Sequence, residues 1–455
     1  MTTGQRIFTR ADQEAFAQLS GDYNPLHMDE LASRRLLFGE TVVHGIHSLL
    51  WILDQWCTGP FQLKRIAAVF RNPIRLGQNA SWTLKSPPSP GTARFLLPGG
   101  TLRIDFEPGP RLAPVPAAAP FPPTLAEVWT MQNIATASGR LPLHLNPALA
   151  AKMFPRLSQQ LPPAQLAALL ACTNIIGMRC PGLHSVFSEL DLRFHTEASP
   201  NPAIAYNVES FDERFNLAVI AIEGASLTGT LTAFLRHPPQ NQLDFSTIAS
   251  HVTPAEFAGQ RALVVGGSRG LGEVIAKLLA AGGAELLITY NRGSADAQRL
   301  AAEIRQAGGT AECLQFDVLH PVLPESCTPT HLYYLATPFI FKAVAGSFSE
   351  ALFQEFCQYY VTAFQKIVTS LLPGGLKKVL YPSSSALDEL PINMAEYSAA
   401  KMAGESMAAF LARHHQLTIR SPRLPRLATD QTTSLIPVEN KDPVPVMLAE
   451  LRALK

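Results

Sequence analysis

The chain contains 455 residues, which is too many for a single hydrophobic core and predicts about two to four domains. Hydrophobic residues make up 47% and charged residues 16% of it, as in folded proteins with ample apolar surface to bury. The 37 basic and 36 acidic side chains leave a net charge of +1. This balance excludes a global electrostatic field that would attract nucleic acid or an anionic membrane.

Cysteine usage and hydropathy indicate the compartment. The six cysteines are scattered and form no C-x-x-C pair, a pattern typical of reduced thiols in a cytosol rather than of a disulfide framework or a zinc site. No apolar run approaches the ~20 residues that span a bilayer. The N-terminus leads into a polar stretch with helical character and no signal-peptide core. We therefore expect a cytoplasmic protein with neither a nucleic-acid nor a membrane partner.

Proline marks two breaks in the chain. Seven prolines fall between residues 108 and 123, and such a run cannot form a helix or a central strand because proline lacks an N–H and fixes φ. It predicts a stiff linker. A second break at 237–242 leads into a polar connector that ends near Gln260. The sequence therefore predicts three segments, 1–107, 124–236 and 260–455.

The strongest single signal lies near the amino terminus, where residues 20–27 read Ser-Gly-Asp-Tyr-Asn-Pro-Leu-His, with Ser33 six places on. An aspartate five residues from a histidine would by itself fit a helix that ends at Gly21, with turn residues after it and His27 on the surface. The full string resembles the signature of the MaoC-like (R)-specific enoyl thioester hydratases, which have the hot-dog fold. This resemblance covers residues 8–75.

The chemistry of such enzymes explains these residue types. Adding water across an α,β-unsaturated thioester requires a water molecule that is held and deprotonated at Cβ and a proton that is delivered to Cα. A carboxylate and an imidazole within hydrogen-bond reach of the same water can do both if their pKa values suit neutral pH. The resemblance implies that Asp22 and His27 are these groups and that Asn24 orients them.

An oxyanion donor is expected where the next helix begins. Negative charge develops on the thioester oxygen, so a preorganised N–H should face it. The apolar run 45–56 predicts a helix, whose first N–H groups are unpaired and lie at the positive end of its dipole. Gly45 lets a substrate approach the backbone closely, and the family pattern agrees with Gly45 as the donor. The neighbouring His44 and His47 could be catalytic or structural.

Segments one and two share an order of elements. In segment one, the helix is followed by strand-like runs at 66–74, 81–85 and 94–105. In segment two, a helix that begins at Pro163, with proline in its first turn, is followed by alternating runs at 190–194, 204–209, 217–222 and 226–235. One helix followed by antiparallel strands, occurring twice, predicts two half-barrels side by side. Together with the resemblance this gives an α+β double hot-dog.

Segment two lacks the Asp-x-Asn-Pro-x-His motif. Similar double hot-dog proteins keep catalysis in one half and use the other to house the acyl chain, usually with the motif in the C-terminal half, whereas here it lies in the N-terminal half. Segment two could be a purely structural partner. We expect a mixed role, in which it supports the first half and forms part of the acyl tunnel.

The third segment changes character. Its strand-like runs are mostly continuous and apolar, as expected of strands covered on both faces, and they lie at 262–265, 286–290, 313–317, 332–335 and 379–381. Helical stretches separate most of them. This alternation predicts an α/β doubly wound parallel sheet, the Rossmann arrangement.

A glycine-rich turn follows the first of these strands and opens a helix. Residues 265–272 read Val-Gly-Gly-Ser-Arg-Gly-Leu-Gly, in which the glycines allow a tight turn and let a pyrophosphate meet the helix N-terminus. The alternative is a tight turn without a ligand. The G-x-x-x-G-x-G spacing resembles the short-chain dehydrogenase/reductase family over residues 260–430, which implies dinucleotide contacts from Gly266, Ser268, Arg269, Gly270, Leu271 and Gly272.

The second strand of this segment indicates which dinucleotide would bind. NAD-binding folds place an acid there to hold the ribose hydroxyls, but this strand ends in Thr-Tyr-Asn-Arg at residues 289–292, without an acid. Arg269 and Arg292 suit the 2′-phosphate of NADP(H), although two solvated arginines are the alternative. By resemblance, Asp317 would contact the adenine.

The reductase chemistry is expected from Tyr397 and Lys401, which lie one helical turn apart and would project into the same cleft. The resemblance implies that Lys401 lowers the pKa of the tyrosine and holds the nicotinamide ribose, while Tyr397 donates a proton as hydride reaches the ketone. Ser384, thirteen residues upstream of Tyr397, completes the family set, with Ser383 and Ser385 beside it. Without these partners, Tyr-x-x-x-Lys would fit a solvated helix face.

Four positions depart from the reductase pattern. Val265 replaces a threonine, residues 335–338 replace an Asn-Asn-Ala-Gly turn, Tyr360 stands where the asparagine of the proton relay belongs, and Arg423 replaces a glycine. The stretch after Asp317 is also short for a full crossover helix, and little chain remains for a seventh strand. We therefore expect a trimmed sheet and an altered proton relay.

Together these patterns predict a two-activity enzyme on acyl thioesters of CoA or acyl carrier protein. NADPH would reduce a 3-oxoacyl thioester, and the resulting (R)-3-hydroxyacyl thioester would be dehydrated to the trans-2-enoyl product, in a fatty-acid-like or polyketide-like pathway. Two alternatives stay open: an oxidative hydratase–dehydrogenase of CoA esters, and a live hydratase on a nucleotide-binding scaffold. The resemblance also implies a homo-oligomer.

Overall fold

The computed structural model describes residues 3–85, 91–97, 99–110, 118–195, 202–343, 346–435 and 438–455. The chain divides into two compact units. Unit 1 comprises Met1–Pro238 and Ser434–Pro437, and unit 2 comprises Pro239–Thr433 and Val438–Lys455. No helix in the described part of the chain is both long and apolar enough to cross a membrane.

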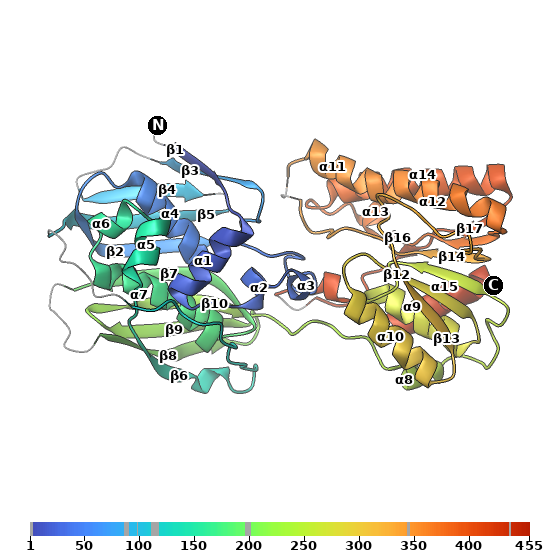
Figure 1. The fold of residues 1–455 in the computed structure, drawn as a ribbon, viewed down its shortest axis with the longest axis horizontal. Helices are drawn as coiled ribbons and strands as arrows, with labels where there is room; N and C mark the ends of the chain where they lie inside the picture. The colour runs from blue at the N-terminus through green and yellow to red at the C-terminus, as the bar shows by residue number, and fades with distance from the viewer. Residues whose placement is uncertain are drawn as a thin grey trace. The chain divides into compact units, whose positions relative to one another are not determined.

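Unit 1 is built on one antiparallel sheet of ten strands, in the order β1-β3-β4-β5-β2-β7-β10-β9-β8-β6 (Figure 1). The first five strands are β1 (Thr3–Ile7), β2 (Phe61–Phe70), β3 (Asn79–Leu84), β4 (Thr92–Leu97) and β5 (Gly100–Pro108). The other five are β6 (Ser138–Pro142), β7 (Ser185–Phe194), β8 (Ala203–Asp212), β9 (Leu217–Gly224) and β10 (Leu227–Leu235). Counted within each half, both halves have the strand order 1-3-4-5-2, and they join where β2 pairs with β7.

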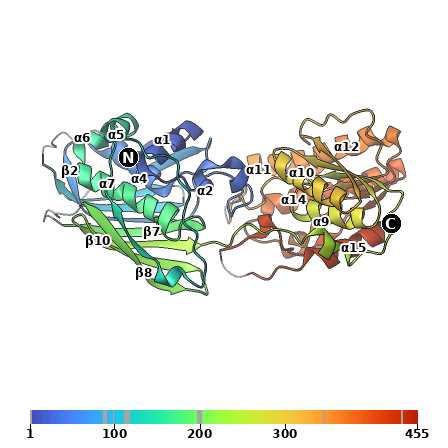
Figure 2. The ribbon, with the colours of Figure 1, turned by 60° about the horizontal axis from the view of Figure 1, so that its bottom comes forward.

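The helices repeat in the same way. α4 (Gly45–Trp56) lies in the chain between β1 and β2, and α7 (Pro163–Asn174) lies between β6 and β7. α7 continues into a π-helical turn, η2 (Ile175–Arg179). Figure 2 shows these helices gathered on one side of the sheet. The shorter helices of this unit are α1 (Arg10–Ser20), α2 (Pro25–Met28), α3 (Glu30–Ser33), α5 (Pro147–Met153), α6 (Leu157–Gln160) and the 3-10 turn η1 (Ile134–Thr136).

Apolar residues explain why α4 and α7 occupy the centre of unit 1. Eight of the twelve side chains of α4 and nine of the twelve residues of α7 are buried, so both are core helices rather than surface helices with one apolar stripe. They contribute to a single hydrophobic core that also includes residues of the strands. The predicted helix 45–56 has the bounds that the structure gives α4.

One expectation about segment one is wrong. The predicted strand 94–105 is the hairpin of β4 and β5, because Gly99, with a φ of 71°, reverses the chain. The polar stretch with helical character after the N-terminus is α1. The residues before it form the edge strand β1, which pairs antiparallel with β3 and which the sequence did not predict, because its residues are mostly polar.

The proline-rich linker expected at 108–123 falls partly outside the described residues, which omit 111–117. The described part that follows, 118–127, contains neither helix nor strand. It is held against the first half by two hydrogen bonds. The Phe121 N–H donates to the backbone oxygen of Gln18 at 2.8 Å, and the Tyr23 hydroxyl donates to the backbone oxygen of Phe121 at 2.7 Å.

Unit 2 contains a parallel six-stranded sheet in the order β13-β12-β11-β14-β15-β17, which confirms the predicted doubly wound arrangement. Its strands are β11 (Arg261–Val265), β12 (Glu285–Tyr290), β13 (Thr310–Gln315), β14 (His331–Tyr334), β15 (Lys378–Leu380) and β17 (Thr418–Arg420). A small parallel pair is formed by β16 (Ser383–Ser384), which follows β15 in the chain, and β18 (Arg423–Leu424), which follows β17. Sequence analysis did not predict β16, β17 or β18.

Helices cover both faces of this sheet (Figure 1). One face buries a core with α9 (Gly270–Ala281), α10 (Ser294–Gln306) and α15 (Pro443–Leu454). The other face buries a second core with α11 (Glu350–Cys357), the π-helix η3 (Gln358–Ala363), α12 (Phe364–Leu371) and α14 (Ala395–His415). Alternate residues of β11 enter the two cores, as the pleat of a strand requires. The remaining elements are α8 (Phe245–Ala249), α13 (Ala386–Glu389), and the 3-10 turns η4 (Leu372–Gly374) and η5 (Asp430–Thr432).

The connection after the third strand, β13, is too short to contain a crossover helix, as expected from the sequence. Residues 316–330, all of them described, contain no helix between β13 and β14. Within the described residues the parallel sheet ends at β17, its sixth strand. The sheet is therefore trimmed as the sequence indicated.

Candidate active sites

Asp22 lies in a buried loop between α1 and α2. α1 ends at Gly21, whose φ of 74° is the left-handed conformation that glycine adopts without strain. Asn24 is the N-cap of α2: its side-chain oxygen accepts a hydrogen bond from the Leu26 N–H at 3.0 Å, and Pro25 occupies the first turn. Asp22 and Asn24 are each 1% exposed, so the loop holds both polar side chains inside the protein.

A hydrogen bond to the backbone holds the ring of His27. Its Nδ1 lies 2.7 Å from the Val42 oxygen. Because a carbonyl oxygen only accepts, Nδ1 carries the proton and Nε2 of the neutral ring keeps its lone pair. Burial lowers the pKa of His27 from its ordinary value, with Asp22 acting against this. His27 is therefore neutral at pH 7, and its Nε2 can accept a proton.

The Asp22 carboxylate accepts two hydrogen bonds. The Thr173 hydroxyl donates to Oδ2 at 2.6 Å, and the Asn24 N–H donates to Oδ1 at 3.2 Å. Burial raises the pKa of Asp22 above its ordinary value, whereas His27 and these two donors act in the opposite direction. The pKa of the acid thus moves up and that of the imidazole moves down, which suits a pair that exchanges protons near neutral pH.

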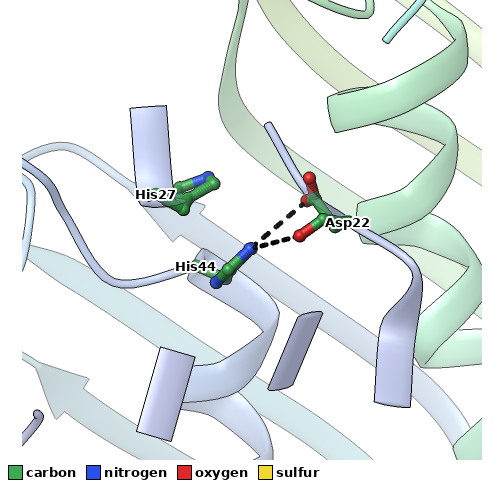
Figure 3. Close-up of side chains that lie close together, drawn as sticks. All are labelled: Asp22, His27 and His44. Atoms are coloured by element: carbon green, nitrogen blue, oxygen red, sulfur yellow. Dashed lines mark hydrogen bonds and ion pairs between the residues drawn. The ribbon is translucent and has the colours of Figure 1, made fainter. Parts of the chain in front are cut away.

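His44 joins these two residues (Figure 3). It is fully buried, and its Nε2 lies 3.0 Å from the Asp22 backbone oxygen and 3.9 Å from Asp22 Oδ2. Its Nδ1 lies 2.7 Å from Gln13 Oε1, and its ring stacks on His27 with centroids 3.9 Å apart. Asp22, His27 and His44 each place one side-chain nitrogen or oxygen atom within 4.8 Å of the others.

His47 has different surroundings. It is fully buried and stacks on Phe16 with ring centroids 4.6 Å apart and planes 3° apart, while the edges of Phe8 and Phe154 meet it from other sides. Burial lowers the pKa of His47 to about 3. Of the two histidines beside Gly45, His44 belongs to the polar cluster and His47 packs in the aromatic core.

A cavity of about 130 Å³ opens beside Asp22 and His27. The first half contributes mainly apolar side chains to its wall, among them Leu26, Phe38, Val42, Phe70 and Ile74. The second half contributes side chains from η2 and the adjoining strands, among them Ile176, Val186, Phe187 and Phe234. An apolar cavity with two convergent polar groups has the character of a ligand site.

Gly45 lies at this cavity as the first residue of α4. A Cβ at this position would lie 2.9 Å from the Phe70 ring, so the site has no room for a side chain. The N–H groups of the first helical turn have no partner within the helix and lie at its positive end. The position therefore suits an oxyanion donor, as the sequence predicted.

The glycine turn of unit 2 has the conformation that its composition predicts. Gly266 and Gly270 have φ of 75° and 56°, a region that favours glycine. α9 begins at Gly270, and a Cβ on Gly272 would lie 2.2 Å from the Gly266 oxygen, so helix and strand approach too closely for any side chain there. Ser268 lies buried in the turn, and Leu271 lines a second cavity.

Arg269 and Arg292, which we expected together at a 2′-phosphate, have different surroundings. Arg269 forms an ion pair with Asp430. Arg292 is exposed. The His320 side chain, 3.0 Å from Asp317, holds the pKa of Asp317 below its ordinary value, and Arg292 adds to this effect. Arg292 is thus near the predicted adenine contact, whereas Arg269 is engaged with an acid.

The structure brings Ser384, Tyr397 and Lys401 together in the second cavity, which has a volume of about 260 Å³. Burial raises the pKa of Tyr397 to about 12, opposed by a hydrogen bond with Ser384. Ser384, rather than Ser383 or Ser385, makes this contact. Lys401 donates to the Pro382 oxygen at 2.7 Å, and burial lowers its pKa to about 7.

Tyr360, one of the departures from the reductase pattern, lies beside this lysine. The Lys401 Nζ lies 4.2 Å from the centroid of the Tyr360 ring and 4.8 Å from that of Tyr381, a cation–π arrangement. The Tyr360 hydroxyl lies 2.5 Å from Thr337 Oγ1. Arg423 instead forms ion pairs with Asp388 and Glu405. Tyr360 and Thr337 thus form a polar pair where the sequence predicted an altered relay.

Sequence analysis missed Thr173, Asn174 and Gly177, through which the second half reaches the Asp22 loop. Asn24 Nδ2 donates to the Gly177 oxygen at 2.9 Å, and Asn174 Nδ2 donates to the Ser20 oxygen at 3.1 Å. A signal was present: Thr173 and Asn174 are two adjacent polar residues that follow the apolar run 166–172. Buried polar residues in such a place require partners.

Two family models match the chain. One, described as a MaoC like domain, matches residues 2–86, and the other, described as short chain dehydrogenase, matches residues 260–322. The chain combines a MaoC-like domain at its N-terminal end with a short-chain dehydrogenase domain further along. The first match contains the Asp22 loop and the second contains the glycine turn. The MaoC-like match implies the hot-dog fold for that part of unit 1.

The short-chain dehydrogenase domain also has curated relatives. The chloroplastic NADPH-dependent aldehyde reductase-like protein of Arabidopsis thaliana is 28% identical over 184 residues, which are 35% of this chain and 68% of that protein. The short-chain dehydrogenase/reductase FrzI of Cladobotryum sp is 47% identical over 62 residues, only 14% of this chain and 24% of that protein. A solved short chain dehydrogenase from Burkholderia cenocepacia, in complex with NADP, is 24% identical and covers 43% of this chain and 91% of its own, with a TM-score of 0.37.

Proposed function

We propose that this protein is a two-activity enzyme on acyl thioesters. Unit 1 dehydrates (R)-3-hydroxyacyl thioesters to trans-2-enoyl thioesters, and unit 2 reduces 3-oxoacyl thioesters with NADPH. The observation that carries the proposal is the convergence of Asp22 and His27 at one cavity whose wall is apolar and contributed by both halves. We further propose that segments 1–107 and 124–236 are the two halves of a double hot-dog and that 260–455 is the reductase.

The geometry supports a specific division of labour in unit 1. In the hydration direction, the ionised Asp22 takes a proton from a water molecule held between Asp22 and His27 as the water oxygen adds to Cβ, and the same proton is then delivered to Cα. The raised pKa of Asp22 makes its carboxylate a stronger base, and the His27 Nε2 lone pair can accept a hydrogen bond from the same water. Gly45 stabilises the negative charge on the thioester oxygen through its N–H at the start of α4. Dehydration is the same path reversed.

The residues of unit 2 fit NADP(H). The glycine turn leaves room for a pyrophosphate at the N-terminus of α9, and β12 ends without an acid that would oppose a 2′-phosphate. Because Arg269 is paired with Asp430, Arg292 is the better candidate for that phosphate. Bound NADPH would supply the hydride. Tyr397 donates a proton to the carbonyl oxygen, and Lys401 stabilises the tyrosinate that this transfer leaves.

A coupled assay tests the proposal. The full-length protein is incubated with acetoacetyl-CoA and NADPH, and the products are separated by chromatography. We expect NADPH oxidation with formation of both 3-hydroxybutyryl-CoA and crotonyl-CoA, and loss of only the crotonyl product in Asp22→Asn. The matched control is Asp29→Asn, which changes the exposed N-cap of α3. NADPH oxidation without any enoyl product would refute the dehydratase assignment.

A second candidate is a hydratase with a nucleotide-binding scaffold that does not catalyse reduction. The replacement of the family turn and relay by Thr337 and Tyr360 favours it. Tyr397→Phe separates the two functions, because a scaffold would lose no activity with this change. We expect the variant to lose NADPH oxidation and to keep crotonyl-CoA hydration.

A further inference from the structure

The second half of unit 1, which lacks the Asp-x-Asn-Pro-x-His motif, contacts the carboxylate of Asp22 directly. Thr173, in the last turn of α7 and 3% exposed, donates its hydroxyl to Asp22 Oδ2 at 2.6 Å across 151 residues of sequence. A threonine in a helix often returns its hydroxyl to the carbonyl one turn earlier. Here the hydroxyl points out of its helix to the carboxylate, which makes a charge-assisted hydrogen bond.

The next turn of the same segment is shaped around the same carboxylate. Gly177 lies four residues after Thr173, in the π-helical turn η2, and a Cβ there would lie 2.2 Å from Asp22 Oδ1. Its backbone oxygen also accepts from Asn24 Nδ2 at 2.9 Å. π-helical turns are uncommon and occur frequently at functional sites. Thr173 provides a donor, and Gly177 provides the space in which the carboxylate lies.

These contacts determine how Asp22 can act. With the Asn24 N–H on Oδ1 and the Thr173 hydroxyl on Oδ2, both oxygens are held in one orientation. Both donors favour the carboxylate over the protonated acid and so oppose the effect of burial. Without the Thr173 hydroxyl, the carboxylate would lose the shorter of its two hydrogen bonds and would be free to turn.

We propose that Thr173 is a positioning residue of the dehydratase: the half that lacks the motif fixes the orientation of Asp22 and helps keep it ionised. This inference rests on the proposed function of unit 1. It gives the second half a role beyond support and acyl-chain binding, because the catalytic carboxylate of Asp22 comes from one half and the Thr173 hydroxyl that orients it comes from the other.

The pH dependence of crotonyl-CoA hydration tests this role. The groups that titrate or carry charge near Asp22 are His27 on α2, His44 before α4, and Arg236 after β10, whose charge lowers the pKa of His27. Thr173→Val keeps the shape and removes the donor, so the pKa of Asp22 should rise. Because a hydrogen bond to a charged group is stronger than one between neutral groups, the acidic limb of the kcat/KM profile should move up by about one pH unit or more.

Two further variants make the result specific. Thr173→Ser keeps the hydroxyl and should keep the acidic limb near that of the wild type. Asn174→Ala removes the neighbouring hydrogen bond between the halves, to the Ser20 oxygen, without touching the carboxylate, and should leave the limb in place. If Thr173→Val does not fold, Thr173→Cys replaces it, because a thiol is only a weak hydrogen-bond donor.

The outcomes distinguish this inference from the proposed function. An unmoved acidic limb in Thr173→Val, or an equal shift in Asn174→Ala, would overturn the positioning role while the hydratase itself stands. A wild-type protein that does not hydrate crotonyl-CoA, or an Asp22→Asn variant that still does, would instead overturn the proposed function. A shift in Thr173→Val alone supports both.

Discussion

At the scale of single residues, burial rather than composition sets the chemistry of both sites. Burial raises the pKa of Asp22 and lowers that of His27, while it raises that of Tyr397 and lowers that of Lys401. In each site, fixed hydrogen bonds then decide which atom is available: Val42 leaves His27 Nε2 free to accept, and Pro382 holds the Lys401 ammonium. These residues can be identified from the sequence, but the burial and the hydrogen-bond partners that shift their pKa values depend on the fold.

The buried Lys401 should make unit 2 less stable at low pH than at high pH. Burial lowers its pKa to about 7, against 10.5 for the free side chain. Because the folded value lies below the unfolded one, the destabilisation is absent above the unfolded pKa and fully present below about pH 7. Lys401→Met should therefore raise the calorimetric melting temperature of unit 2 more at about pH 6 than at about pH 10.

The control for this prediction is Lys366→Met, which changes an exposed lysine of α12. It should shift the melting temperature little at either pH. Lys401→Met should in addition abolish NADPH oxidation. Equal stabilisation by Lys401→Met at both pH values would contradict the lowered pKa of the buried ammonium.

At the scale of elements, predictions from the sequence were most accurate for features that depend on a single helix or strand. The apolar run 45–56 predicted α4 with its observed bounds, because a run of this kind can be recognised as a buried helix without knowing which elements pack against it. The hairpin within 94–105 was missed, since a single glycine turn interrupts an otherwise continuous strand pattern. The contact from Thr173 to Asp22 was beyond prediction, because it depends on how two halves 151 residues apart meet.

The π-helical turn η2 should tolerate no side chain beside the carboxylate. Gly177→Ala places a Cβ 2.2 Å from Asp22 Oδ1, so the carboxylate must move. Small misplacement of a catalytic group can reduce the rate by about 100-fold, and we expect a loss of that size in crotonyl-CoA hydration with unchanged NADPH oxidation. The matched control is Gly59→Ala, in the same unit, where an added Cβ has nothing within 4 Å. Equal activity of the two variants would show that η2 does not shape the site.

At the scale of the whole molecule, each unit has its own core and its own cavity. The family resemblances from the sequence are supported by matches at 2–86 and 260–322, whereas the repeated strand order of unit 1 became clear only from the sheet. A motif can be recognised within one short stretch, but the pairing of β2 with β7 joins strands that are far apart in the chain.

Because the two units have separate cavities, a variant inactivated in unit 1 and a variant inactivated in unit 2 should complement each other when they are mixed. Asp22→Asn should convert acetoacetyl-CoA and NADPH to 3-hydroxybutyryl-CoA and stop there. Tyr397→Phe should leave both reagents unchanged but still hydrate crotonyl-CoA. Mixed together, the two variants should again form crotonyl-CoA, because the intermediate can leave one molecule and enter another. A mixture that forms none, although each variant keeps its remaining activity, would show that the intermediate does not pass between molecules.

The central claim is that Asp22 and His27 act as a unit on one water molecule, and a double-mutant cycle on crotonyl-CoA hydration tests it most directly. Groups that act together are not additive, so removing the second costs little once the first is gone. We predict that Asp22→Asn with His27→Gln is no slower than the slower single variant, with each single variant reduced by about 100-fold or more. Losses that multiply in the double variant would contradict the claim.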